Sequence, residues 1–277
     1  MSSAHLVRQC YWFSPALPWL ELRSTWQSRQ SYKTHSHQQL SLGLIEQGGT
    51  CCRSLERDHR LQAGDLALFA PQQAHSCNPL PGRARSYHML YLDEAWCRAR
   101  LTQRCGYPVG ALRVSRLHIR DEALARDFRA LVAVLTRNDL AGARLWLHRL
   151  TDRLFDRYCQ PADAPGPAHP LTQRLRQRLQ DNLLAPPSLA TLAAEFGLRE
   201  ETLIRRFRQD TGITPKAFVT NARIEYARRL IRSGSPLADA GYQSGFSDQS
   251  HFHKMFVQYS AATPGQYRLA RSIFDNK

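Results

Sequence analysis

Two copies of one helical pattern lie in the C-terminal third of the chain, and they constrain its fold more than any other feature. The first copy, SLATLAAEFGLREETLIRRFRQDTGITP, begins at Ser188, and the second, PLADAGYQSGFSDQSHFHKMF, begins at Pro236. In each copy a glycine, Gly197 or Gly245, lies between two apolar runs at helical spacing, because glycine adopts the left-handed conformation of a sharp turn at little cost. Residues 215–232 predict one helix between the copies, with a proline in its first turn. The sequence therefore predicts two helix-turn-helix units.

The second helix of each unit is predicted to have an apolar inner face and a polar outer face. The inner positions hold Leu203 and Phe207 in the first unit, and Phe246, Phe252 and Phe256 in the second. The outer positions hold Arg199, Glu201, Thr202, Arg205 and Arg206 in the first unit, and Gln249, Ser250, His253 and Lys254 in the second. A recognition helix presents such side chains to base edges in the major groove of DNA. A connecting helix ~27 Å long would place the two recognition helices about 34 Å apart, which is one turn of B-DNA.

The charge of the chain agrees with a nucleic-acid partner. The chain has 38 Lys and Arg against 23 Asp and Glu, and its net charge of +15 favours a polyanion, either nucleic acid or an acidic membrane surface. We expect phosphate contacts from basic residues in and beside the two units, namely Arg174, Arg206, Arg223 and Arg228. No run of about 18 apolar residues predicts a membrane span, and the N-terminus lacks the pattern of a secretion signal. Seven cysteines without a CxxC pair favour reduced thiols, so we expect a cytoplasmic protein.

The rest of the chain predicts strands followed by a helical hairpin. Between residues 43 and 93, short alternating or apolar runs bounded by turn residues predict a small antiparallel barrel or sandwich. Apolar residues at helical spacing over residues 119–158, interrupted at Asn138, predict two helices in a hairpin. The segment QPADAPGPAHP, residues 160–170, is typical of an interdomain linker. We therefore predict an α+β chain.

Three histidines of the strand-rich region form a candidate site. His35 and His37 are two residues apart, so on a strand both imidazoles would point to the same face. They precede one predicted strand, and His75 follows a second one. Three imidazoles can line a ligand pocket or bind a divalent metal of the zinc or iron type. Cys51, Cys52 and Cys77 are possible soft ligands, although Cys51 and Cys52 would point to opposite faces of one strand.

At these residues the chain resembles the AraC/XylS family of bacterial transcription regulators, including its cupin-like sensor domains. The resemblance is carried by LATLAAEFGL, NARIEYARRLI and GFSDQSHFHKMF, and by His35, His37, Gly64, Asp65, Pro71, His75 and the segment from Tyr87 to Asp93. It implies a cupin-like ligand-sensing β-barrel over 1–118, a helical dimerisation hairpin over 119–159, a linker over 160–170 and a DNA-binding domain over 171–277. It also implies a homodimer, a small-molecule effector, RNA polymerase as a partner and activation of transcription.

The chain departs from the family pattern at a few positions. Ala240 and Gly241 stand where the family usually has Ile-Ala, and glycine inside a helix costs about 1 kcal/mol, which predicts a looser second unit. Ala261 replaces the usual glycine before Thr-Pro. Metal-binding cupins have a ligand glutamate shortly after the paired histidines, and here residues 38–41 read QQLS.

We therefore predict an effector pocket touching His35, His37 and His75, with no metal, no other cofactor and no catalytic role. A metal site at the same histidines and a purely structural role for them are the alternatives. For the whole chain, the alternatives are a metal-dependent cupin enzyme fused to a DNA-binding module and a structural nucleoid-binding protein.

Overall fold

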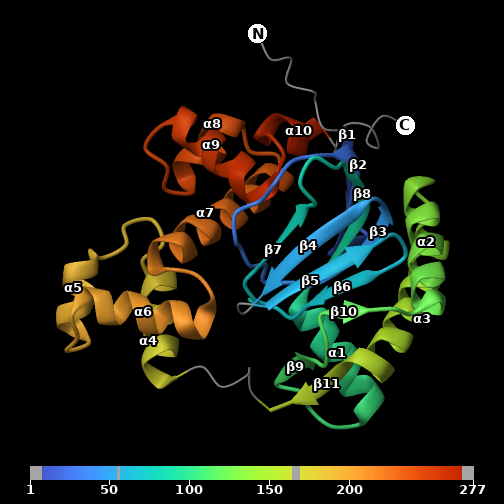
Figure 1. Cartoon of the computed structure of the whole chain (residues 1–277), viewed down its shortest axis with the longest axis horizontal. Coiled ribbons are helices and arrows are strands. Elements are labelled where there is room, and N and C mark those ends of the chain that lie inside the picture. The colour runs from blue at the N-terminus through green and yellow to red at the C-terminus, as the bar shows by residue number, and fades with distance from the viewer. Residues whose placement is uncertain (1–7, 55–56, 164–168, 270–277) are drawn as a thin grey trace.

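Most strands of the N-terminal half form two antiparallel sheets in the computed structural model, which describes residues 8–54, 57–163 and 169–269. The larger sheet contains, in spatial order, β1 (Arg8–Ser14), β2 (Leu17–Ser28), β8 (Arg85–Leu92), β3 (Leu40–Gln47), β6 (Leu66–Phe69) and β10 (His118–Ile119). The smaller sheet contains β5 (Arg57–Gln62), β4 (Gly49–Ser54) and β7 (His75–Pro79). Figure 1 shows these sheets between two groups of helices. The α+β fold class predicted from the sequence is confirmed.

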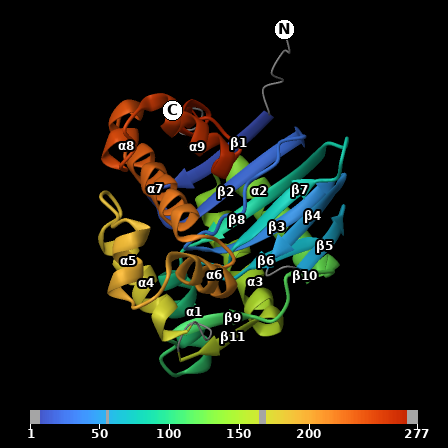
Figure 2. The same cartoon turned by 60° about the vertical axis from the view of Figure 1, so that its left-hand side comes forward.

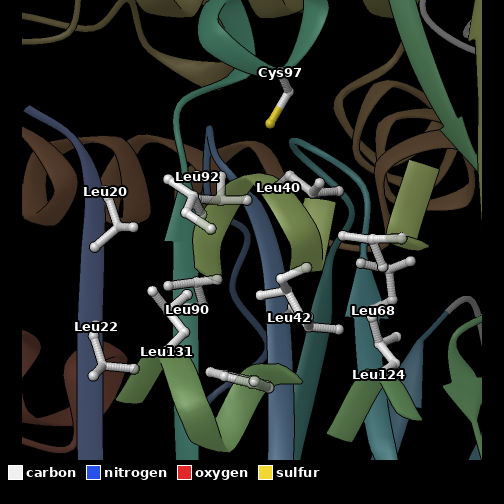
Figure 3. Close-up of a cluster of buried hydrophobic side chains, with 14 of the residues drawn as sticks. Leu20, Leu22, Leu40, Leu42, Leu68, Leu90, Leu92, Cys97, Leu124 and Leu131 are labelled. Atoms are coloured by element: carbon white, nitrogen blue, oxygen red, sulfur yellow. The ribbon is translucent and has the colours of Figure 1, made fainter. Parts of the chain in front are cut away.

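Alternation along the strands of the larger sheet gives it two different faces. Leu20 and Leu22 of β2, Leu40 and Leu42 of β3, and Leu90 and Leu92 of β8 point to one face and form a buried apolar cluster with the helices that follow (Figure 3). The intervening residues, such as Arg23 and Tyr87, point to the opposite face, which lies toward the smaller sheet. The main apolar core thus lies on the helix-covered face of the larger sheet, and a smaller apolar cluster that includes Ile45, Cys52 and Phe69 lies between the sheets.

The helices on the apolar face are α1 (Glu94–Cys105), α2 (Glu122–Thr136) and α3 (Leu140–Tyr158). The last two confirm the predicted hairpin. Asn138 takes a left-handed conformation with φ of 55°, and the Asp139 side chain accepts a hydrogen bond from the backbone N–H of Gly142 at the start of α3. The resemblance implies dimerisation through this hairpin, but its leucines Leu131, Leu135, Leu147 and Leu154 are at most 1% exposed. They pack in the core of their own chain, so they do not supply an apolar face for a dimer.

The C-terminal helices form the two predicted helix-turn-helix units. They are α4 (Pro170–Asp181), α5 (Leu189–Glu195), α6 (Glu200–Thr211), α7 (Pro215–Arg232), α8 (Leu237–Gln243), α9 (Gln249–Ser260) and α10 (Pro264–Leu269). Gly197 and Gly245 make the two turns with φ of 63° and 88°. All five predicted inner residues are buried, and α7 has the predicted bounds.

Gly241 does not loosen the second unit as the sequence suggested. It is buried in α8, and a Cβ added to it would lie 2.8 Å from the ring of Phe252 in α9. Glycine therefore lets the two helices of this unit approach closely, which offsets the intrinsic cost of a helical glycine.

Two further expectations need correction, namely a linker over residues 160–170 and reduced thiols. Residues 160–162 of the predicted linker belong to β11 (Cys159–Ala162), which pairs with β9 (Ala111–Val114), while residues 164–168 lie outside the described residues. Cys52 and Cys77 form a disulfide between β4 and β7, because the strand register places them directly opposite each other. That register could not be read from cysteine spacing. No helix in the described part of the chain is long and apolar enough to cross a membrane.

Candidate ligand pocket and nucleic-acid interface

The predicted recognition positions lie on the surface of both units. Arg199 precedes the first residue of α6, and Gln249 is the first residue of α9. Eight of the nine predicted side chains are exposed and Thr202 is partly exposed, whereas Leu203 and Phe252 on the opposite faces are buried. The geometry thus presents these side chains to solvent, and their contact with DNA stays a prediction.

Two of the four predicted phosphate-binding arginines have other partners. Arg228 is 6% exposed and forms ion pairs with Glu21 and Glu225. Arg223 donates hydrogen bonds to the carbonyl oxygens of residues 183 and 184, both at 3.0 Å, and its guanidinium lies beside Gly245. The prediction was wrong for buried Arg228, because a basic residue on the helix between the two units was assumed to face DNA. For Arg223, which is partly exposed, it stays a prediction. Arg174 and Arg206 are exposed.

The three predicted site histidines meet in one buried cluster. His35 and His37 lie in the segment that precedes β3, and His35 pairs through its backbone with His75 at the start of β7. The ring centroid of His35 lies 4.8 Å from that of His37 and 4.7 Å from that of His75. Phe69 stacks on His75 with a centroid distance of 3.8 Å. The sequence therefore identified the cluster correctly, although the paired histidines are not on a strand.

Each of these imidazoles is held through Nδ1. His35 Nδ1 lies 2.7 Å from the carbonyl oxygen of residue 33, His75 Nδ1 lies 2.9 Å from that of residue 73, and His37 Nδ1 lies 3.1 Å from Glu225 Oε1. The Nε2 atoms are then the remaining ligand positions. One nitrogen from each ring lies within 4.8 Å of the others, so the donor set could hold a divalent ion with open coordination positions. Glu225, the carboxylate of this cluster, binds His37 Nδ1 and fixes the ring.

Burial keeps two of these imidazoles neutral. Burial, together with the neighbouring His37, lowers the pKa of His35 to about 3, and burial also holds the pKa of His75 well below its ordinary value. Neutral imidazoles donate through one ring nitrogen and accept through the other. With Nδ1 as the donor, Nε2 faces the pocket as an acceptor.

A pocket beside the histidines is lined from both sheets and from the C-terminal helices. The strands contribute Arg23, Arg85, Tyr87 and Tyr91 among others, the segment before β3 contributes Tyr32, and the C-terminal domain contributes Arg228 of α7 with Tyr259 and Ser260 of α9. The sequence analysis missed the two strand arginines and the tyrosines. The signal was present in β2, where Glu21 and Arg23 alternate with buried leucines and so must share the face opposite the apolar core.

One face of α7 contacts the strand domain formed by the two sheets, called the barrel below, through polar side chains. Asn221, Glu225, Arg228 and Arg232 are spaced four, three and four residues apart, which places them on one face of the helix. Asn221 Nδ2 donates to the carbonyl oxygen of residue 36 at 2.7 Å. Arg228 and Arg232 both donate to the carboxylate of Glu21 on β2, and Arg228 also binds Glu225 at 2.8 Å. Figure 2 shows α7 beside the sheets, between the two helix-turn-helix units. The helix that joins the units is therefore also the wall of the pocket.

Buried Glu225 is an anion in this network. Although burial acts in the opposite direction, Arg228 and His37 hold the pKa of the Glu225 carboxyl well below its usual range.

We expect the chain to lose stability as the pH falls below about 6.5. His35 and His75 have lower pKa values in the folded chain than the ordinary value of 6.5, so the unfolded chain binds their protons first. Above pH 6.5 the two imidazoles cause no pH dependence. Below it, the free energy of unfolding falls by about 1.4 kcal/mol per pH unit for each imidazole, down to about pH 3 for His35. Urea unfolding at about pH 7.5 and about pH 5.5 measures the loss. His75→Asn should reduce it, and His148→Asn, at an exposed position, should not. Equal pH dependence in all three proteins would contradict the assignment of neutral imidazoles.

Comparison with known proteins assigns both halves of the chain. A model of AraC-like ligand-binding domains matches residues 19–150, and a model of helix-turn-helix domains matches residues 192–270. The chain is 28% identical over 229 residues to YbfI, an uncharacterized helix-turn-helix-type transcriptional regulator of Bacillus subtilis, which covers 80% of this chain and 82% of that protein. It is 33% identical over 97 residues to the transcriptional activator RhaS of Escherichia coli, and this match covers 35% of each chain.

The fold also matches a solved structure over nearly the whole chain. ToxT from Vibrio cholerae superposes with a TM-score of 0.56 at 12% identity, and the match covers 95% of this chain and 97% of ToxT. Strand-rich and helical halves thus have the same arrangement in both proteins. Because the two domain models together span most of the residues, the chain is a member of the AraC family of transcription regulators, with an AraC-like ligand-binding domain followed by a DNA-binding helix-turn-helix domain.

Proposed function

We propose that the chain is a cytoplasmic transcription activator that binds DNA as a homodimer and responds to a small molecule in the pocket. The observation that carries this proposal is the composition of the pocket wall. Arg228, Tyr259 and Ser260 come from the DNA-binding domain, while His37 and the strand residues come from the barrel. A molecule in this pocket contacts both domains.

Control then follows from differential binding. A ligand changes the relation between the two domains only if it binds their alternative arrangements with different affinity. Inserted among His37, Glu225 and Arg228, a ligand would compete for the hydrogen bonds that attach α7 to the barrel. The coupling free energy between two sites is typically about 1–3 kcal/mol, which corresponds to roughly a 5- to 150-fold change in DNA affinity.

DNA binding is proposed to divide between two kinds of contact. Arg174 and Arg206 bind phosphates and supply affinity, while the outer residues of α6 and α9 read bases and supply sequence choice. RNA polymerase is the partner through which an activator acts, and the relatives RhaS and VirF are described as activators.

The histidines are proposed to bind the effector directly, without metal and without catalysis. Nε2 of His35 and His75 would accept hydrogen bonds from the ligand, because each Nδ1 donates to a backbone carbonyl. A thermal-shift screen of small molecules, run on the wild type and on His75→Ala, tests this proposal. An effector should stabilise the wild type and change its DNA affinity, and both effects should weaken in the variant. Metal analysis is the second measurement, and one equivalent of zinc or iron that depends on His37 would contradict the metal-free version.

Dimerisation is proposed to use the outer face of α3. Leu145 on this face is 69% exposed, whereas the leucines of the inner face are buried in the chain's own core. A two-fold dimer would present two DNA-binding domains to a two-part operator.

Replacing Leu145 with glutamate is expected to shift the protein from dimer to monomer at micromolar concentration. Leu145 is the apolar side chain of a face that otherwise carries charged residues such as Arg149 and Asp152. The substitution removes the apolar contact and buries a carboxylate in both copies, which costs several kcal/mol. Light scattering measures the mass, and Leu184→Glu provides the control because Leu184 is 57% exposed but lies beside the first helix-turn-helix unit. A wild type that is monomeric with and without DNA, or a Leu145→Glu protein that remains dimeric, would rule out this interface.

A further inference from the structure

Among the buried charges at the pocket, one group is balanced. The contact between α7 and the barrel contains Arg228 and Arg232 as cations and Glu21 and Glu225 as anions, and the hydrogen-bonded ion pairs connect all four. Two positive and two negative charges cancel. This part of the interface needs no further ion.

Arg23 and Arg85 remain without a counter-charge. They are 4% and 1% exposed, and neither forms an ion pair with any residue of the described ranges. Arg23 donates to the neutral Gln9 side chain at 2.9 Å, and Arg85 donates to Thr50 Oγ1 and to the carbonyl oxygen of residue 77. A buried cation without a paired anion is costly, so proteins pair such groups or neutralise them. Arginine cannot lose its proton under physiological conditions.

Both guanidinium groups border the same part of the pocket. Arg23 and Arg85 lie 5.4 Å and 5.7 Å from the ring centroid of Tyr32, and 5.8 Å and 4.7 Å from that of Tyr87. Each arginine also has a buried Nε that finds no hydrogen-bond partner in the described structure. Free donors on two adjacent guanidinium groups match the acceptors of an oxyanion.

The positive field of the two arginines acts on Tyr87, whereas burial raises the pKa of the Tyr32 phenol. Although burial acts in the opposite direction, Arg23 and Arg85 lower the pKa of the Tyr87 phenol. Tyr87 and Tyr32 hydrogen-bond to each other through their hydroxyl groups. The pocket therefore favours negative charge at this position before any ligand is considered.

We propose that the effector is a small organic carboxylate whose carboxylate group binds Arg23 and Arg85, with its carbon skeleton against the tyrosine rings. The charged end of the pocket supplies the anion specificity, and Ile45, Ala67 and Met89 supply an apolar surface for an organic body. This assignment rests on the proposed function in one respect, namely that the pocket is the effector site. It adds the chemical class of that effector.

The first test needs no ligand. In protein freed of small anions, replacing an uncompensated buried arginine by methionine should remove an unfavourable charge, while replacing a paired one should expose its partners. We expect Arg23→Met and Arg85→Met to match the wild-type melting temperature or exceed it by about 2–4 °C, and Arg228→Met to fall by at least about 5 °C. If Arg85→Met loses as much as Arg228→Met, the arginine has a structural role and the proposal is overturned.

The second test uses benzoate as the probe, with benzamide as its uncharged match and inorganic phosphate as a non-organic anion. At about 10 mM, benzoate should raise the melting temperature of the full-length wild type by on the order of 3 °C, and benzamide should not. The shift should disappear in Arg23→Met and Arg85→Met and persist in Arg83→Met, since Arg83 is exposed on the turn before β8. No benzoate shift in the wild type, an equal shift with benzamide, or a shift with phosphate alone would each overturn the assignment. These measurements contain no DNA, so a failure of the DNA-binding proposal leaves their result unaffected, and the reverse also holds.

Discussion

Replacing Glu21 with glutamine is expected to lower the free energy of unfolding by on the order of 3 kcal/mol. Glu21 is 3% exposed, and its carboxylate accepts hydrogen bonds from Arg228, Arg232 and the hydroxyl group of Tyr267. Removing the negative charge leaves Arg228 buried with one charged partner, Glu225, and replaces the ion-paired link between β2 and α7 by neutral hydrogen bonds. Loss of one member of a buried pair is costly because the other charge stays out of water.

Urea unfolding of the full chain measures this effect, and a surface ion pair supplies the control. Asp58 pairs with Arg53 at 2.6 Å, but the two side chains are 45% and 65% exposed. Asp58→Asn should therefore leave the free energy of unfolding nearly unchanged. Because the Glu21 contacts join the two domains, Glu21→Gln should also abolish any effect of a bound effector on DNA affinity. Similar stability changes in the two variants would show that the interdomain network contributes little to the free energy of unfolding.

Replacing Arg205 with alanine is expected to weaken operator binding by about 1–3 kcal/mol, or roughly 5- to 150-fold at fixed salt. Arg205 is exposed on α6 two residues before buried Phe207, which places it on the outer face of the recognition helix. An arginine that binds a guanine edge discriminates among bases, so the loss should be larger on the operator than on unrelated DNA.

Fluorescence anisotropy with labelled operator DNA measures the change. Lys254→Ala in α9 should cost less, because lysine presents one compact charge where arginine presents a planar fork. Arg83→Ala, which removes an exposed charge from the barrel, controls for the general loss of positive charge. An Arg205→Ala protein with unchanged operator affinity would exclude α6 as a base-reading helix in the proposed orientation.

The helical half of the chain could be predicted in detail because local rules determine it. Apolar residues at helical spacing, turn glycines and the proline in the first turn of α7 predicted both units, and the bounds of α7 were predicted to the residue. Ser188, Thr214 and Asp248 each accept a backbone N–H at a helix start, which is a local contact that sequence reveals.

What the sequence could not show are contacts between domains. Arg228 of α7 was expected to bind phosphate, yet Arg228 and Glu225 are buried against β2 and His37. A polar helix face has the same pattern whether it meets solvent, nucleic acid or a matching polar surface. The pairing of Cys52 with Cys77 likewise depends on strand register. The histidine cluster was predicted from the two-residue spacing of His35 and His37 on an expected strand, although both residues lie in the segment before β3.

The central claim is that two recognition helices read specific DNA under the control of the barrel, and sequencing the genomic fragments that the purified chain retains tests it most directly. The account predicts a shared motif with two blocks of bases whose centres lie about 10 base pairs apart, one block for each unit. It also predicts that a protein carrying both Arg205→Ala and Lys254→Ala loses this enrichment. Fragments without a common motif, retained equally well by that variant, would contradict the account.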